Sequence, residues 1–177
     1  MAFTAYLGVL VLGYQRLLRY AYGIYGVALG SLVLVLLVGV VTKGSQSWFS
    51  FGPFRLQPSE LVKVSLALFM GKYLCRYPPV TARSFCTALG LMGVPALLVL
   101  LQPDLGSTLV YGSMIFVALF VAGASSRLLG GLGIALAGFF PLGWIYFLKD
   151  YQKMRLLVFL DPYADPLGAG YNVIQSR

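Results

Sequence analysis

Long runs without a single charged residue set the strongest limit on how this chain can fold. Four of them cover 20 residues or more: Ala21–Thr42, Ser84–Pro103, Leu105–Ser126 and Leu128–Leu148. An α-helix needs about 20 apolar residues to cross the hydrocarbon core of a bilayer. Charged residues make up only 10% of the chain, against about 25% in a soluble domain. The sequence therefore predicts an all-α, polytopic transmembrane helix bundle.

Other segments complete the predicted bundle. Residues 2–15 are uncharged but shorter than a full span, and Pro58 to about Leu74 reads as another helix, which gives about six membrane segments. The N-terminus lacks the basic region and cleavage site of a signal peptide, so we expect it to remain in the mature chain. Lys149–Arg177 has mixed charge and Asp-Pro turn signals, and we expect it outside the hydrocarbon.

Basic residues predict the orientation of the helices. The net charge of +8 comes from single and paired cations between apolar runs, a pattern that indicates membrane topology and not a nucleic-acid partner. One side carries six of these in short loops, against Lys43 and Arg55 on the other, and we expect the richer side in the cytoplasm. The six are Arg16, Arg19, Lys72, Arg76, Arg83 and Arg127. Cys75 and Cys86 flank a loop on that side, where thiols stay reduced, so no disulfide is expected. The chain has no histidine, and no Cys/His zinc site is expected either.

Local signals refine the predicted elements. Arg16 and Arg19 suggest a short basic turn, and Lys43–Arg55 has the composition of a loop with Trp48 as an interfacial anchor. Pro95 should remove one helix hydrogen bond and kink its segment. Gly26 and Gly30, with Gly23 nearby, have a spacing that would let another helix approach closely, although glycine is also simply common in membrane helices.

The stretch Gln57–Lys63 carries an acid and a base into a predicted membrane helix. Gln57 can close the end of the helix, Pro58 suits its first position, and a carboxylate at Glu60 favours the positive end of the helix dipole. Lys63 follows Glu60 by three residues, so the two side chains share a face and can form an ion pair.

Gln102-Pro103-Asp104 repeats this Gln-Pro-acid pattern at the start of the apolar run Leu105–Ser126. Two membrane crossings separate the two starts, so both must face the same side, and the basic residues place that side outside. The residues leave two interpretations open: capped helix starts with a local ion pair, or a functional site. In the second, Glu60, Lys63, Asp104 and Arg55 would converge where helix N-termini and cations attract phosphate. The acids could instead bind a divalent cation.

Together these stretches resemble the SEDS family of bacterial cell-wall proteins, typified by RodA, FtsW and SpoVE. The resemblance covers nearly the whole chain in the family's order and spacing, and Asp150–Arg155 and Gly170–Ser176 are most similar to the RodA branch. The motifs that carry it are Lys43–Trp48 with Gly52, Gln57–Lys63, Gln102–Ser107 and Phe159–Ser176.

The resemblance implies a glycosyltransferase that polymerises lipid II, an undecaprenyl-diphosphate-linked sugar, at the outer face of the bacterial cytoplasmic membrane, for cell-wall elongation and cell shape. It implies a class B penicillin-binding protein as partner and a divalent cation, Mg or Mn, with unknown ligands. Lys63, Glu60 and Asp104 would line the family's central cavity, and we group Arg55 with them. The residues given a motif or structural role are Gln57, Pro58, Gln102, Pro103 and Gly106.

Family members have ten membrane helices, and their catalytic aspartate lies in a large outer loop beyond the Gly-Ala-Gly-Tyr stretch. We therefore expect residues 1–177 to form a single partial SEDS membrane domain in which 149–177 begin that loop. On this interpretation the chain is an incomplete, inactive form, no catalytic residue is assigned, and whether it acts as an enzyme stays open. The alternatives are a lipid II flippase and a non-catalytic scaffold that binds cell-wall synthesis partners.

Overall fold

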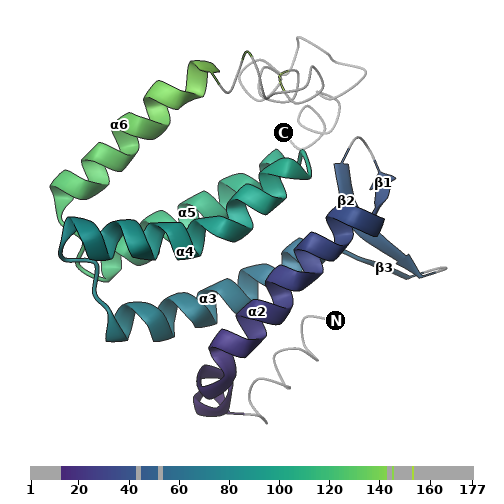
Figure 1. Ribbon diagram of the computed structural model, residues 1–177, viewed down its shortest axis with the longest axis horizontal. Coiled ribbons are helices and arrows are strands. Elements are labelled where there is room, and N and C mark those ends of the chain that lie inside the picture. The colour runs from purple at the N-terminus through teal and green to yellow at the C-terminus, as the bar shows by residue number, and fades with distance from the viewer. Residues whose placement is uncertain (1–12, 43–44, 52–53, 143–144, 146–152, 154–177) are drawn as a thin grey trace, which may run out of the picture. The chain divides into compact units, whose positions relative to one another are not determined.

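The computed structural model describes residues 13–42, 45–51, 54–142, 145 and 153 (Figure 1). The chain divides into two compact units, Met1–Leu129 and Gly130–Arg177, each of which is described by itself. Four helices form the first unit: α2 (Tyr14–Val38), α3 (Pro58–Arg76), α4 (Ala82–Leu101) and α5 (Leu105–Val121). A further helix, α6 (Ser126–Leu142), begins in the first unit and continues into the second. The predicted helices at Pro58 and in the four apolar runs are all present.

Some helix boundaries differ from the prediction. Helix α2 starts at Tyr14, so Arg16 and Arg19 lie in its first two turns and the predicted basic turn is wrong. Arginine is a good helix former, and its long side chain can reach the interface from within a helix. Helix α5 ends five residues early because Gly123 adopts a φ of 86°. The N–H groups of Gly123 and Ala124 then bond the carbonyls of Phe120 and Leu119, which closes the helix.

A small sheet lies between α2 and α3, formed by the last three residues of the predicted span Ala21–Thr42 and by the segment predicted as a loop. Strands β1 (Val40–Thr42), β2 (Ser45–Phe51) and β3 (Phe54–Leu56) pair antiparallel in that order. Val40 pairs with Trp48, and Phe49 pairs with Leu56. The aromatic and β-branched residues of this segment suit a pleated surface and outweigh its loop-like Ser and Gly content. The sheet leads the chain from the end of α2 directly into the start of α3 (Figure 1).

Buried residues recur every three or four positions along α4 and α5, as at Tyr111, Ile115 and Leu119 of α5. The outward faces remain strongly apolar, with Val27 and Val121 each 77% exposed. Such faces suit contact with lipid. Among the described helices, Gln15–Val38 and Ala82–Leu101 are long and apolar enough to cross a membrane, and Leu105–Val121 and Ser126–Phe139 are shorter apolar helices.

The glycine stripe of α2 does not serve as a close helix contact in the described part of the chain. A Cβ atom added at Gly23, Gly26 or Gly30 would meet no atom within 4 Å. Helix α2 buries a different face, which carries Tyr25 and Leu32. The predicted close approach is therefore not found among the described residues.

A tyrosine compensates for the proline inside α4. Pro95 has no N–H to offer the carbonyl of Leu91, four residues earlier. The hydroxyl of Tyr25 in α2 donates a 2.6 Å hydrogen bond to that carbonyl. The bond thus joins α2 to α4 at the Leu91 carbonyl, which lacks its usual helix donor because Pro95 has no N–H.

This arrangement predicts energetic coupling between Tyr25 and Pro95. Tyr25→Phe should lower the free energy of unfolding by about 1 kcal/mol. In a Pro95→Ala background the new N–H would bond the Leu91 carbonyl, and the same substitution should cost less than half as much. Thermal unfolding of the four proteins in detergent micelles measures the coupling. Tyr22→Phe is the control, since among the described residues its hydroxyl makes no hydrogen bond. Equal losses in both backgrounds would contradict the assignment.

Candidate functional site

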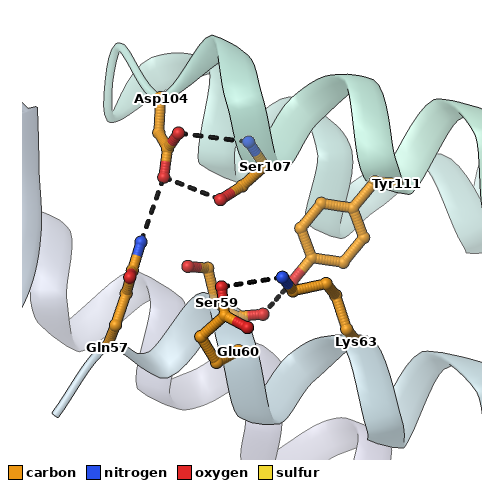
Figure 2. A network of polar contacts seen from close by, with 7 residues as sticks. All are labelled: Gln57, Ser59, Glu60, Lys63, Asp104, Ser107 and Tyr111. Atoms are coloured by element: carbon orange, nitrogen blue, oxygen red, sulfur yellow. Dashed lines mark hydrogen bonds and ion pairs between the residues drawn. The ribbon is translucent and has the colours of Figure 1, made fainter. Parts of the chain in front are cut away.

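The two Gln-Pro-acid helix starts lie side by side. The side-chain amide of Gln57, at the start of α3, donates a 3.1 Å hydrogen bond to Oδ2 of Asp104, at the start of α5 (Figure 2). The prediction that both starts face the same side of the bundle is confirmed. Residues 47 positions apart in sequence thus form one polar cluster.

Asp104 is the N-cap residue of α5. Its Oδ1 accepts a 3.1 Å hydrogen bond from the backbone N–H of Ser107, and its Oδ2 accepts a 2.8 Å bond from the Ser107 hydroxyl. The carboxylate therefore sits at the positive end of the helix dipole, as its sequence position suggested. With the bond from Gln57 added, the carboxylate accepts three hydrogen bonds, two from side chains and one from a backbone N–H, and is held in one orientation.

Gln57 plays a different part from the one predicted. It is the N-cap residue of α3, but its side chain makes no capping hydrogen bond to its own helix. The carboxylate of Asp104 offers a charged acceptor, which forms a stronger hydrogen bond than a neutral one. Pro58 follows as the first helical residue, as predicted, and is buried.

Glu60 and Lys63 form the predicted ion pair, with 2.7 Å between Oε1 and Nζ. Both stay accessible, since the Glu60 side chain is 58% exposed and that of Lys63 23%. An exposed pair of this kind stabilises a helix by less than about 1 kcal/mol. The pair lies on the turn of α3 that follows Gln57, beside the Asp104 cluster (Figure 2).

Tyr111 is a member of the cluster that the sequence did not single out. Its side chain is fully buried, and its hydroxyl donates a 2.6 Å hydrogen bond to the carbonyl of Ser59 in the first turn of α3. The available signal was its spacing of seven residues from Asp104, two helical turns along the same face. Tyr111 and Gln57 together fasten the first turns of α5 to those of α3.

The remaining motif residues are close to Asp104 in sequence. Gln102 is 1% exposed, and its amide donates a 3.2 Å bond to the carbonyl of Leu32, so it ties the end of α4 to α2. Pro103 is half-buried, and Gly106 is exposed in the first turn of α5. A Cβ at Gly106 would lie 3.7 Å from Oδ1 of Asp104, an ordinary contact, so space does not demand glycine there.

Arg55 stands apart from the other predicted site residues. Its backbone belongs to β3 and pairs with Ser50, whereas its side chain lies outside the part of the structure that is described. Its convergence on the acids stays a prediction. The predictions for 149–177 also fall outside the described residues, apart from Lys153.

The described residues do not form a metal site by themselves. No group of three or more Asp, Glu, His or Cys side chains is close enough to hold an ion within the described ranges. Of the two carboxylates near the cluster, Glu60 is paired with Lys63, and Asp104 accepts three hydrogen bonds. A divalent cation would need further oxygen ligands.

An apolar groove lies between α3 and α5, beginning on α3 at Ala67, one turn beyond Lys63. Ala67, Gly71 and Leu74 follow Glu60 and Lys63 at spacings of three or four residues, so all share one face of α3. Together with Met114, Ala118 and Val121 of α5, the three α3 residues line a cavity of about 780 Å³. A charged end and an apolar groove thus share one helix face.

Comparison with known proteins places these features in context. The family model for FtsW, RodA and SpoVE, described as "cell cycle protein", matches residues 1–177. The peptidoglycan glycosyltransferase MrdB of Escherichia coli K12 is 38% identical over 155 residues, which are 87% of this chain and 42% of MrdB.

Two solved structures share the fold. One, of a peptidoglycan synthase complex, is 44% identical with a TM-score of 0.75, over 92% of this chain and 48% of that one. The other, the rod shape determining protein RodA of Thermus thermophilus, is 39% identical with a TM-score of 0.65, over 74% of this chain and 44% of that one. The chain spans less than half the length of these relatives.

Proposed function

Because the chain belongs to the family of FtsW, RodA and SpoVE cell cycle proteins, we propose that it forms part of a peptidoglycan glycosyltransferase. In this proposal it provides the region that holds lipid II in the cytoplasmic membrane. The names of its relatives, which include a peptidoglycan glycosyltransferase and a rod shape determining protein, support the reaction class. The membership also supports the predicted helix bundle as a membrane protein.

The observation that carries the proposal is the junction of the two helix starts. The N-terminal ends of α3 and α5 meet at the Gln57–Asp104 hydrogen bond, with Lys63 one turn further on. The dipoles of the two helices favour a phosphate at such a place. Lys63 is 23% exposed, so its ammonium group can still reach a ligand.

The charges of the cluster assign different parts of the substrate to different residues. Glu60, Lys63 and Asp104 carry a formal charge of −1 together, so the three of them do not attract a diphosphate as a group. In this proposal Lys63 donates a hydrogen bond to the diphosphate. The helix N-termini assist it, as does Arg55 if its side chain extends to the same place. The carboxylates accept hydrogen bonds from sugar hydroxyl groups, which are neutral donors.

The groove between α3 and α5 supports a lipid-linked substrate over a soluble one. It begins on the face that carries Glu60 and Lys63, and apolar side chains line it as far as Leu74. A diphosphate head at the helix starts and a prenyl chain along the groove would use both parts of this face.

The proposal places the protein as a multi-pass component of the bacterial cytoplasmic membrane, with the cluster at the outer leaflet and a class B penicillin-binding protein as partner. The basic residues support the orientation. The similarity to a chain from a peptidoglycan synthase complex supports assembly with a second synthesis protein.

The experiment uses the protein at its natural length, reconstituted with its transpeptidase partner and fluorescent lipid II. Glycan chains that lengthen with time on a gel are the expected result. A separate assay follows the movement of lipid II between leaflets of protein-containing liposomes. Movement without glycan formation would contradict the proposal and favour a flippase. Neither activity in a folded protein would favour the scaffold.

A further inference from the structure

A second cavity, of about 510 Å³, lies between α2, α3 and α4 at the end of the bundle opposite the starts of α3 and α5. Aromatic rings form most of its wall, and Arg76 lies at its edge. Phe69 stacks on Tyr25 at 4.2 Å between ring centroids, Tyr73 follows Phe69 at 5.5 Å, and Tyr77 follows Tyr73 at 5.3 Å. The aromatic residues of the wall are Tyr22, Tyr25, Phe69, Tyr73 and Tyr77.

This end carries only positive charge among the described residues. The start of α2 and the end of α3 meet here, since the ammonium group of Lys72 donates a 2.7 Å hydrogen bond to the carbonyl of Arg19. The cations of these ends and of the first turn of α4 are Arg16, Arg19, Lys72, Arg76 and Arg83. Within the described ranges the acids, Glu60 and Asp104, belong to the starts of α3 and α5. A counter-ion must therefore come from outside the described chain.

Two of the cations are held beside the cavity. Lys72 lies 4.5 Å from the ring centre of Tyr22, and the guanidinium carbon of Arg76 lies 5.7 Å from that of Tyr77. They are four residues apart on α3, one turn or about 6 Å along the axis. Neither has a carboxylate partner among the described residues.

The cavity is polar at its rim and apolar below. Phe69 lies about 10 Å further into the bundle than Arg76 at 1.5 Å per residue, and Leu91 of α4 also lines the wall. Tyrosine and tryptophan favour the depth of lipid headgroups, and basic pockets between membrane helices bind anionic headgroups. A free phosphate would leave the aromatic wall unused.

We propose that this cavity binds an anionic phospholipid, with its phosphate on Arg76 and Lys72 and the first carbons of its acyl chains between the aromatic rings. The ligand is a lipid of the leaflet that faces the basic end of the bundle. The inference is independent of the function proposed for the opposite end, because it uses none of the same residues.

The test measures binding of phosphatidylglycerol to the purified protein in neutral detergent by native mass spectrometry, with phosphatidylcholine and inorganic phosphate as comparison ligands. We expect saturable binding of phosphatidylglycerol and little of the other two. Arg76→Gln should weaken it about fivefold, as should Lys72→Gln. Arg83→Gln is the matched control, since it removes a charge from the same end, but Arg83 neither lines the cavity nor lies over one of its aromatic rings, as Arg76 and Lys72 do.

Three results would overturn the proposal. The first is an equal loss of binding for Arg83→Gln and Arg76→Gln, which would indicate diffuse attraction to a charged surface. The second is equal binding of phosphatidylcholine, and the third is full displacement of the lipid by inorganic phosphate. Thermal unfolding of each variant without lipid establishes that a loss of binding is not a loss of folding.

Discussion

Replacing Asp104 with alanine should lower the free energy of unfolding by about 2 to 3 kcal/mol. The substitution removes the N-cap of α5, which contributes about 0.5 to 2 kcal/mol. It also removes the charged acceptor of the Gln57 amide, a bond that joins α3 to α5. In a chain of this size the melting temperature in detergent should fall by roughly 4 to 12 °C, which differential scanning fluorimetry measures.

Asp104→Asn is the matched control. Asparagine caps a helix about as well as aspartate, and the Gln57 amide can rotate to offer its oxygen to the new NH₂ group. We therefore expect this variant to keep most of the stability while losing the charge. An alanine variant as stable as the wild type would contradict the role of Asp104 in joining the helices.

Replacing Lys63 with alanine should separate stability from function. The Glu60–Lys63 pair is partly exposed, so the free energy of unfolding should change by less than about 1 kcal/mol. Loss of a charged donor to phosphate should slow glycan synthesis by the natural-length protein about tenfold to a hundredfold. The measurement combines thermal unfolding with the rate of glycan formation from lipid II.

Lys63→Arg keeps the positive charge at the same position and is the control for that loss. It should retain much more activity than the alanine variant, although the guanidinium group differs from an ammonium in shape. If the alanine variant polymerised lipid II at the wild-type rate, the Glu60–Lys63 pair would be only a local stabiliser of α3.

Local chemistry made the two helix starts predictable. Pro58 at the first helical position, Glu60 in the first turn and its pairing with Lys63 depend on residues within one turn of each other. The number of crossings between the starts also predicted that they face the same side. Apolar periodicity and the position of the motifs were sufficient to predict the helix starts, the ion pair and the shared side, because each has few alternative arrangements.

Contacts between residues far apart in the sequence were harder to predict. Gln57 was expected to close its own helix, but its amide bonds Asp104 on another helix. The bond from Tyr111 to Ser59 likewise depends on how α5 packs on α3. A sequence fixes neither the distance between two helices nor the side chain that fills the gap, so such partners require the three-dimensional structure.

The sheet of β1 to β3 shows where composition misled the prediction. Gly44, Gly52 and Pro53 indicate turns, and Lys43–Arg55 was therefore assigned to a loop, with Val40–Thr42 assigned to the membrane span before it. The residues between these turn signals include Trp48, which pairs with Val40 of β1, and Phe49, which pairs with Leu56 of β3. Gly and Pro residues at the ends of short strands indicate a β-hairpin as much as a loop.

The most direct test of the central claim is the affinity of the purified protein for lipid II and for undecaprenol, which lacks the diphosphate and sugars. If the joined starts of α3 and α5 hold the diphosphate, Lys63→Ala should raise the Kd for lipid II about tenfold or more and leave the Kd for undecaprenol unchanged. An unchanged Kd for lipid II in the alanine variant, or an equal rise for both ligands, would contradict the claim.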